Sequence, residues 1–237
     1  MDGHMFQAEI VERIERHGVL ARSESHPSAL AQWMIGVPMK IRASHEIYSE
    51  WETANYIYEI TSGAVRTVKL FADGGRQIGA FYFAGDLFGL EDGSDHSFSA
   101  EAIVDSKLRV IKRRTLFHMA SKDRELARQL LLVSTREMAR LHRHALMLGQ
   151  TAEQRLCSFL LEMAERISIG GLIELPMSRQ DIADYLGVTI ETVSRTFTTL
   201  TARSAIALPN SRAVVLRNRA ALTEYLRSGD RGGHSRR

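Results

Sequence analysis

The sequence predicts an α+β fold with three consecutive parts: a strand-rich N-terminal domain, a long helix and a C-terminal winged helix-turn-helix. Three patterns predict these parts. Short alternating segments separated by glycine turns occupy residues 41–111, and an apolar repeat typical of a long helix runs through 131–148. Two short helical segments then meet at residues 186–188, which is typical of a helix-turn-helix.

The length and composition indicate a globular chain of two domains. Domains commonly contain ~100 to 200 residues, so 237 residues are enough for two. The 44% of hydrophobic and 25% of charged residues provide a core for each domain. We expect an N-terminal domain over 1–115, a dimerisation helix over 116–149, and a C-terminal domain over 150–237 that ends in a flexible tail from residue 227.

Insertion into a membrane and secretion are not expected. The longest aliphatic run, Leu130–Val133, is far shorter than the ~20 apolar residues of a spanning helix. The N-terminus is charged, unlike a signal peptide, so we expect a cytoplasmic protein. Its single cysteine, Cys157, cannot form an internal disulfide, and alone it cannot hold a zinc ion or an iron–sulfur cluster.

The positive charge is concentrated in the last third of the chain. Residues 1–150 contain 19 basic and 19 acidic side chains, whereas residues 151–237 contain 12 arginines, no lysine and nine acids. Arginine can grip phosphate or guanine with two parallel hydrogen bonds, so this bias favours a nucleic-acid partner. On charge alone, a solvated basic surface is an equally good interpretation.

The N-terminal half reads as helices followed by strands. Residues 6–35 indicate short helices. The segments 56–60, 64–71 and 76–83 then have the residue types of strands, and Asp73-Gly74 between the last two is typical of a tight hairpin. Several short strands at this spacing predict a sandwich or barrel.

An apolar stripe with helical spacing follows. Its six residues are spaced 3, 4, 3, 4 and 3 apart, which places them along one side of a long helix. The stripe could pack on the core of its own chain, but its length and charged flanks favour a dimer helix. We call it the 131–148 stripe, and it consists of Leu131, Ser134, Met138, Leu141, Ala145 and Leu148.

The C-terminal third begins with a capped helix. Thr151 is a suitable N-cap for a helix that runs to about Ile167, and the glycines at 170–171 are expected to end it. Residues 172–176 then predict a short strand.

Two shorter helices come next. Ser178 is expected to cap the first, with Asp181 three residues later as in a capping box, and Gly187 to end it. Thr189 is expected to cap the second helix, which continues through Leu200. The strand–turn–strand pattern of 205–216 predicts a wing.

One face of the second helix has the residues for reading bases. Glu191, Ser194 and Arg195 stand at i, i+3 and i+4, where a helix-turn-helix enters the major groove. Arg195 can bond O6 and N7 of guanine, Glu191 can accept from the amino group of cytosine, and Ser194 permits a close approach. The alternative is a surface ion pair between Glu191 and Arg195, worth ~0.3 to 0.5 kcal/mol, and it is compatible with base recognition.

Six polar or cationic side chains nearby are candidates for phosphate contacts. Each of them alone is more often an ordinary surface residue. They are Ser178, Arg179, Thr189, Thr192, Thr196 and Arg212. Asp184, on the first helix, is expected to be solvated.

These features resemble those of the CRP/FNR transcription regulators. Residues 177–200 look like the helix-turn-helix of that family, and E-T-V-S-R at 191–195 is similar to the E-x-x-S-R motif of its FNR branch. Segments 58–66 and 83–90 resemble the family's cyclic-nucleotide-binding-type β-roll, and 131–148 falls where the family has its dimer helix. The resemblance implies a homodimeric regulator, mostly an activator, with double-stranded DNA and RNA polymerase as partners.

Two departures from the family narrow the resemblance. Members that bind cyclic AMP have an arginine and a serine for the phosphate, whereas residues 90–102 here contain Ser97 and Ser99 but no arginine. A buried phosphate without a cation is costly, so no cyclic nucleotide is expected. Residues 1–40 have none of the cysteines that hold the FNR cluster. The FixK-like branch remains, which is associated with microaerobic, respiratory and nitrogen-fixation genes and needs no cofactor.

Ile190 refines the expected DNA site. The FNR-type motif implies half-sites of the TTGA type facing TCAA. Ile190 occupies the position where cyclic-AMP receptor proteins have an arginine that reads a second guanine. An isoleucine can contact only a thymine methyl, which disfavours a TGTGA half-site.

Three other functions compete with this interpretation. A metal-dependent cupin enzyme would need clustered histidines, but the strand region contains only His45 and His96, far apart in the sequence. No G-x-S-x-G motif indicates a hydrolase. Because both enzyme signatures are missing, neither catalytic residues nor a metal are expected. A regulator gated by a nucleotide, haem or redox change is the nearer alternative, although Cys157 among leucines favours a core residue over a redox sensor.

Overall fold

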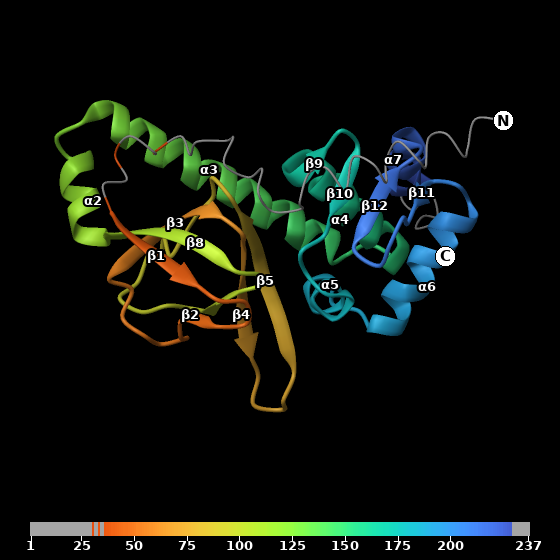
Figure 1. Ribbon diagram of the computed structural model, residues 1–237, viewed down its shortest axis with the longest axis horizontal. Coiled ribbons are helices and arrows are strands. Elements are labelled where there is room, and N and C mark those ends of the chain that lie inside the picture. Colours follow the sequence, from red (N-terminus) through yellow and green to blue (C-terminus); the bar gives the residue numbers. More distant parts are fainter. Residues whose placement is uncertain (1–29, 31–32, 34–35, 229–237) are drawn as a thin grey trace, which may run out of the picture. The chain divides into compact units, whose positions relative to one another are not determined.

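The computed structural model describes Leu30, Trp33 and residues 36–228, and these form two compact units (Figure 1). The first unit comprises the described residues up to Thr67 and Phe81–Leu130. The second comprises Val68–Ala80 and the described residues from Leu131 onward. Apart from Leu30 and Trp33, the predicted helices of 6–35 lie outside the described residues, and so does the predicted tail beyond Ser228.

Antiparallel strands form two sheets in the N-terminal half of the chain, and most of these strands belong to the first unit. One sheet has the order β1-β8-β3-β6, with Val37 opposite Val110 and Tyr58 opposite both Val110 and Phe88. The second sheet has the order β2-β7-β4-β5. The strands are β1 (Val37–Ile41), β2 (Glu46–Tyr48), β3 (Tyr56–Ser62), β4 (Ala64–Leu70), β5 (Arg76–Phe83), β6 (Leu87–Phe88), β7 (Ser99–Ala102) and β8 (Ser106–Lys112).

The predicted hairpin between β4 and β5 is confirmed. Gly74 has a φ of +84°, which a glycine adopts without strain. Around it, the Phe71 carbonyl accepts from the N–H of Gly74 at 3.0 Å, and the Asp73 carboxylate accepts from the N–H of Gly75 at 2.8 Å. The end of this hairpin, Val68–Ala80, belongs to the second unit.

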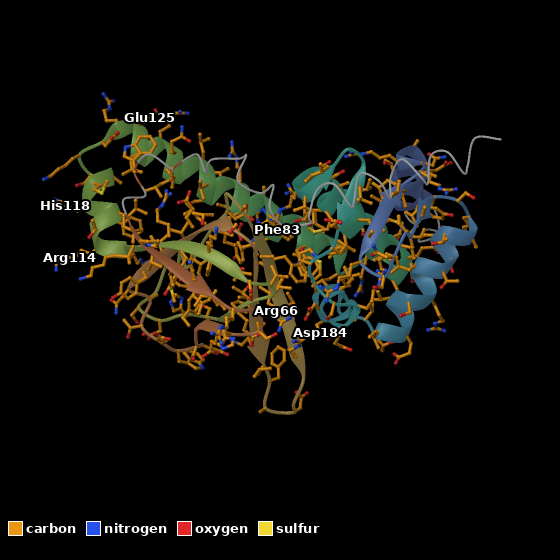
Figure 2. The ribbon with its side chains drawn as sticks, viewed as in Figure 1. Arg66, Phe83, Arg114, His118, Glu125 and Asp184 are labelled. Carbon is orange, nitrogen blue, oxygen red and sulfur yellow. The ribbon has the colours of Figure 1, made fainter. Side chains whose placement is uncertain are left out.

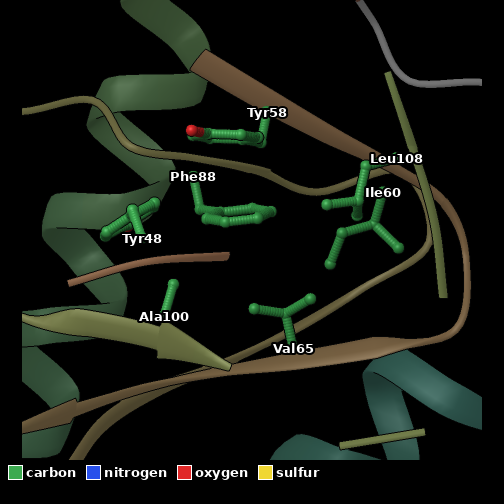
Figure 3. Close-up of a cluster of buried hydrophobic side chains, with 7 residues drawn as sticks. All are labelled: Tyr48, Tyr58, Ile60, Val65, Phe88, Ala100 and Leu108. Atoms are coloured by element: carbon green, nitrogen blue, oxygen red, sulfur yellow. The ribbon is translucent and has the colours of Figure 1, made fainter. Parts of the chain in front are cut away.

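Aromatic and aliphatic side chains fill the inside of the β-roll. Figure 3 shows the Phe88 ring beneath that of Tyr58, and the two ring centres are 5.0 Å apart in a stacked arrangement. Tyr48 lies 6.1 Å from the Phe88 ring centre. This buried cluster consists of Tyr48, Tyr58, Ile60, Val65, Phe88, Ala100 and Leu108.

Strand β3 is buried on both faces over most of its length. Tyr56 is exposed, but Ile57 and Glu59 are buried together with Tyr58 and Ile60. The buried carboxylate of Glu59 accepts from Arg109 Nη1, directly opposite on β8, at 3.1 Å. A buried charge with a hydrogen-bonded partner is tolerated in such a position.

The helical segment after the β-roll is divided in two, which corrects the prediction of one helix over 116–149. Helix α2 (Arg113–Ala120) ends before Ser121, and α3 (Arg124–Met147) begins after Asp123. The Asp123 carboxylate accepts from the backbone N–H groups of Glu125 and Leu126 at 2.9 and 3.0 Å. Asp123 therefore satisfies the free N–H groups at the start of α3, as an N-cap does.

From Ala152 on, the second unit combines short helices with a small sheet of order β11-β12-β10-β9. No described helix is long and apolar enough to cross a membrane. The elements are α4 (Ala152–Ile167), β9 (Ser168–Ile169), β10 (Leu172–Glu174), α5 (Arg179–Leu186), α6 (Ile190–Ala202), β11 (Ile206–Ala207), β12 (Ala213–Leu216) and α7 (Arg219–Ser228).

Two details of the C-terminal prediction are wrong. Gly170 and Gly171 do not end α4, which stops at Ile167; they form the turn between β9 and β10, with φ values of +60° and +85°. Helix α7 was not predicted, and it includes the first two residues of the segment expected to be a tail from residue 227. It packs against α4, where Gln154 donates to the carbonyls of Tyr225 and Leu226 at 3.1 and 3.3 Å.

Candidate DNA-binding surface

Helix α4 packs against both helices of the helix-turn-helix and supports them. Its predicted N-cap Thr151 accepts from the N–H of Gln154, and the Gln154 side chain accepts from the N–H of Thr151 at 3.0 Å. This reciprocal pair is a capping box. Beyond it, Leu156, Phe159 and Leu160 are fully buried and form the inner face of the helix.

The first helix of the motif, α5, begins as predicted. The hydroxyl of Ser178 accepts from the N–H of Asp181 at 3.0 Å, and the Asp181 carboxylate accepts from the N–H of Ser178 at 3.0 Å. Asp181 is almost completely buried, so its charge forms part of the structure of the helix terminus. A carboxylate is also favoured there by the helix dipole.

The turn between the two helices depends on Gly187. It has φ +63° and ψ +42°, the left-handed conformation expected of a helix C-cap, and it lets the N–H of Val188 reach the carbonyl of Ala183 at 3.1 Å. Arg155 on α4 fixes the same turn from below. Its guanidinium donates to the carbonyl oxygens of Leu186, Leu148 and Gln150 at 2.7, 2.6 and 3.0 Å. Sequence reasoning missed this role.

The second helix, α6, has a buried side and an open side. Thr189 caps it by accepting from the N–H of Thr192, as predicted. Val193, Phe197 and Leu200 are buried against the rest of the domain. Because a helix turns every 3.6 residues, the positions between them face outward. Glu191, Ser194 and Arg195 are all exposed, and Ile190 at the first position is partly exposed.

No ion pair joins Glu191 and Arg195 within the described chain. The guanidinium of Arg195 instead lies 3.4 Å from the hydroxyl of Thr192. Hydrogen bonds from its own backbone N–H and from Thr189, followed by the charge of Arg195, lower the pKa of Glu191. A charged carboxylate and an open guanidinium therefore stand side by side on the exposed face.

Arg179 has an inward position that the sequence did not indicate. Its guanidinium carbon lies 3.3 Å from the centre of the Phe197 ring, and Nη2 donates to the carbonyl of Ser211 at 3.2 Å. Of the described side-chain atoms, Arg179 Nη1 is buried without a hydrogen-bond partner. Burial lowers the pKa of Arg179 to about 10. Arg179 thus connects α5, α6 and the loop of the wing.

The other candidates for phosphate contacts differ in accessibility. Ser178, Thr189 and Arg212 are exposed and Thr192 is partly exposed, while Arg212 also donates weakly to the carbonyl of Pro176 at 3.4 Å. Thr196 is 8% exposed, and its hydroxyl donates to the carbonyl of Thr192 at 2.8 Å.

Asp184 is not the solvated residue that the sequence suggested. Its side chain is 11% exposed and is labelled in Figure 2. One of its oxygens accepts from Arg76 at 2.6 Å and the other from Gln180 at 2.6 Å. The partner, Arg76, comes from the β4–β5 hairpin, more than 100 positions away in the sequence.

The 131–148 stripe is exposed in the single chain. The exposed fractions are 67% for Leu131, 55% for Met138 and 51% for Leu141. Ser134, Ala145 and Leu148 are exposed as well. The interpretation that the stripe packs on the chain's own core is therefore wrong for the described residues. Large apolar side chains that remain in water along one helix are typical of an interaction surface.

The segment 90–102, which corresponds to the phosphate-binding segment of cyclic-AMP-binding members, forms contacts within its own chain. His96 is buried and stacks on Tyr48 with ring centres 3.5 Å apart, while its Nδ1 lies 3.4 Å from the Glu91 carboxylate. Ser97 donates to Glu91 at 3.2 Å, and Ser99 accepts from the N–H of Glu50 at 2.9 Å. His96, Ser97 and Ser99 thus have partners inside the chain.

The remaining candidate residues have structural positions. Cys157 is fully buried, and burial together with the charge of Glu153 raises its pKa to about 12. A thiol in this state is a core residue and a poor nucleophile, which confirms the core interpretation. Within 36–228 and at Leu30 and Trp33, no group of three His, Cys, Asp or Glu side chains is arranged to hold a metal ion.

Comparison with known proteins agrees with this architecture. Residues 38–123 match the model of the cyclic nucleotide-binding domain, and residues 154–225 match the Crp-like helix-turn-helix domain. The chain is 44% identical to the nitrogen fixation regulation protein FixK of Azorhizobium caulinodans, over 86% of this chain and 85% of that protein.

Two further similarities are informative. The transcriptional activatory protein AadR of Rhodopseudomonas palustris is 35% identical, over 68% of this chain and 70% of its own length. The solved structure of FixK2 from Bradyrhizobium japonicum superposes with a TM-score of 0.78 at 44% identity, covering 81% of this chain and 97% of that one.

Proposed function

Because the chain belongs to the CRP/FNR family of transcription regulators, we propose that it activates nitrogen-fixation or microaerobic respiratory genes by binding a two-fold symmetric DNA site as a homodimer. The relatives are named as regulators, and the chain is not an enzyme. The names of FixK and AadR support the pathway and the activating role.

One observation carries the proposal: the residues that can read bases lie together on the open face of α6. Glu191, Ser194 and Arg195 are exposed, while the buried positions of the helix are apolar. In this proposal Arg195 bonds O6 and N7 of guanine, and Glu191 accepts from the amino group of the cytosine paired with that guanine. Ile190 contacts a thymine methyl. These contacts correspond to TTGA and its complement TCAA.

The helix termini and the wing provide the phosphate contacts. Ser178 and Thr189 are exposed at the N-termini of α5 and α6, where backbone N–H groups and the helix dipoles favour an anion. Thr192 and Arg212 complete an accessible set. Arg179 and Thr196 remain predicted contacts, but Arg179 already donates to the wing loop at Ser211 and Thr196 to the carbonyl of Thr192 within α6.

The dimer is proposed to form through the 131–148 stripe. Its large apolar members are exposed in the single chain, and their spacing suits two parallel helices that pack along a shared line. A pair of recognition helices related by two-fold symmetry would then meet the two halves of a palindrome.

The β-roll is proposed to be a scaffold that requires no nucleotide. Phe88, Tyr48 and Tyr58 fill the interior, and His96 and Ser97 both contact Glu91. No cofactor is needed for DNA binding in this proposal. We also propose a cytoplasmic location and RNA polymerase as the protein partner, because both are typical of the family.

Binding to defined duplexes tests the proposal. Purified protein is titrated into a labelled palindrome of TTGA facing TCAA and, at the same salt concentration, into one of TGTGA facing TCACA. Preference for the first duplex by at least tenfold is expected. Equal binding to the two duplexes and to an unrelated sequence would mean that α6 does not read bases as proposed.

A further inference from the structure

The β4–β5 hairpin contributes one arginine to the first helix of the helix-turn-helix. Arg76 is the first residue of β5, just after the turn at Gly74. Arg76 and α5 belong to the same compact unit. Its Nε donates to Asp184 at 2.7 Å, and its Nη2 lies 2.8 Å from Asp181 and 2.6 Å from Asp184.

The two carboxylates that receive Arg76 lie on one face of α5. They are three residues apart, so they share a face and repel each other when both are charged. The side chain of Asp181 is 3% exposed and that of Asp184 is 11% exposed. Water therefore screens these charges poorly, and the guanidinium of Arg76 provides the compensating positive charge.

Asp181 connects Arg76 to Ser178 at the N-terminus of α5, which is the end proposed to face DNA. Its Oδ1 accepts from Arg76, while its Oδ2 accepts from the backbone N–H and the hydroxyl of Ser178 at 3.0 and 2.9 Å. On the other side, Asp184 accepts from Gln180 through Oδ1 and from Arg76 through Oδ2. A single guanidinium thus stands at the centre of a hydrogen-bonded chain that runs from Ser178 through Asp181, Arg76 and Asp184 to Gln180.

The charge balance of α5 also indicates that Arg76 favours DNA binding. Without Arg76, α5 would have two uncompensated carboxylates close to the surface proposed to approach the phosphates. Like charge would then repel DNA, and Ser178 would lose the fixed orientation that Asp181 gives it. No residue of the DNA-facing surface itself would have changed.

We propose that Arg76 is a positioning residue for DNA binding, which holds α5 through Asp181 and Asp184 so that the helix-turn-helix presents its contacts to DNA. This inference rests on the proposed function of α6 as the reading helix. It assigns to a residue of the strand-rich half of the sequence a direct influence on the affinity of the C-terminal domain.

The test compares four variants on the TTGA-type palindrome at a temperature where each is folded. Arg76→Met and Asp184→Asn should each lower affinity about tenfold, and their combination should lose much less than the product of the two, because they break one shared interaction. Arg76→Lys keeps the charge and should restore most of the affinity. In the first turn of α5, amide hydrogen exchange should accelerate in Arg76→Met and remain near wild type in Arg76→Lys.

Arg66→Met is the matched control. Arg66 is also an arginine of this hairpin, labelled in Figure 2, and it forms a similar ion pair with Glu101 at 2.7 Å on β7. Its loss should leave DNA affinity unchanged. An equal loss in Arg66→Met would mean that any damage to the hairpin matters, and the positioning role would be rejected.

Three other results bear on the proposal. Unchanged affinity in folded Arg76→Met overturns it. A smaller dependence of affinity on salt in Arg76→Met would also overturn it, because that would mean that Arg76 itself contacts a phosphate. Arg195→Ala is measured in parallel. If this variant binds DNA as tightly as wild type, the proposed function fails. If Arg195→Ala loses affinity while Arg76→Met keeps it, only the positioning role is rejected.

Discussion

Glu191 and Arg195 lie one turn apart on the exposed face of α6, and no ion pair joins them among the described residues. Oppositely charged residues at i and i+4 often pair. Here Thr189 and the N-terminal turn of the helix hold the carboxylate, and the guanidinium rests near Thr192. Both charged groups are therefore available to DNA without first breaking a bond between them.

Arg195→Ala should abolish specific binding while the fold remains intact. The loss of a guanine contact costs about 1 to 3 kcal/mol per half-site, and a symmetric dimer loses it twice. Affinity for the TTGA-type palindrome is measured by fluorescence anisotropy, with Arg219→Ala as the control for a lost charge, because Arg219 pairs with Glu165 at 2.8 Å. Tight specific binding by Arg195→Ala would mean that the recognition helix has been misplaced.

Substitution of the 131–148 stripe should separate the dimer. Met138→Glu or Leu141→Glu would place like charges opposite each other in a desolvated interface, which strongly disfavours association. Sedimentation at micromolar protein should show monomers, and DNA binding should be lost at ordinary concentrations.

Leu146→Glu provides the matched control for this experiment. Leu146 is 75% exposed on the same helix but lies outside the stripe, so this variant should remain a dimer. If Met138→Glu is dimeric as well, the interface lies elsewhere on the chain.

Gly187→Ala should destabilise the protein by about 1 to 2 kcal/mol, because an L-residue is strained at the φ of +63° found there. A new methyl group would meet only ordinary contacts, the nearest being Arg155 Nη1 at 3.5 Å, so the cost arises in the backbone. Urea unfolding measures the change. Gly93→Ala, with an ordinary φ and no atom within 4 Å of the new methyl, should leave the free energy of unfolding unchanged.

His144 should make stability depend on pH. Burial, and next the charge of Arg140, lower its pKa, against a hydrogen bond with the backbone of Tyr185 that raises it. The unfolded chain therefore binds the proton first as the pH falls through about 6.5, and stability is lost toward acid. Between pH 7 and pH 5, the free energy of unfolding should fall less for His144→Gln than for wild type. Parallel curves for the two proteins would contradict this assignment.

The local features of the C-terminal domain were predictable because their signals are local. Thr151, Ser178 and Thr189 have the side chains that N-caps require, and Gly187 can adopt the conformation that ends a helix. Each signal needs only neighbours within a few residues, and the structure confirms all four. The break at Asp123 has the same local chemistry, since an aspartate can cap a helix, but the prediction of one helix over 116–149 did not use this signal.

The contacts that organise the site could not be predicted in this way. Arg76 meets Asp181 and Asp184 across more than 100 residues of sequence, and Arg155 reaches the turn at Gly187 across 32. Such pairs depend on the tertiary fold, and a single sequence has no pattern that indicates them. Arg179 was predicted as a phosphate contact, whereas its burial on Phe197 depends on packing.

The β-roll should respond to neither cyclic AMP nor cyclic GMP. Phe88 and its aromatic neighbours fill the interior, and the segment from 90 to 102 has no arginine for a phosphate, while Ser97 and His96 already contact Glu91. Purified protein should therefore bind its palindrome without added nucleotide, and millimolar nucleotide should change neither DNA affinity nor melting temperature.

A ligand present at 100 times its Kd would add about 2.7 kcal/mol to the stability of the folded state, which a melting curve detects easily. The duplex itself serves as the positive control, because specific DNA should raise the melting temperature in the same assay. An upward shift with either nucleotide, or DNA binding that appears only in its presence, would identify the β-roll as a receptor and contradict its role as a scaffold.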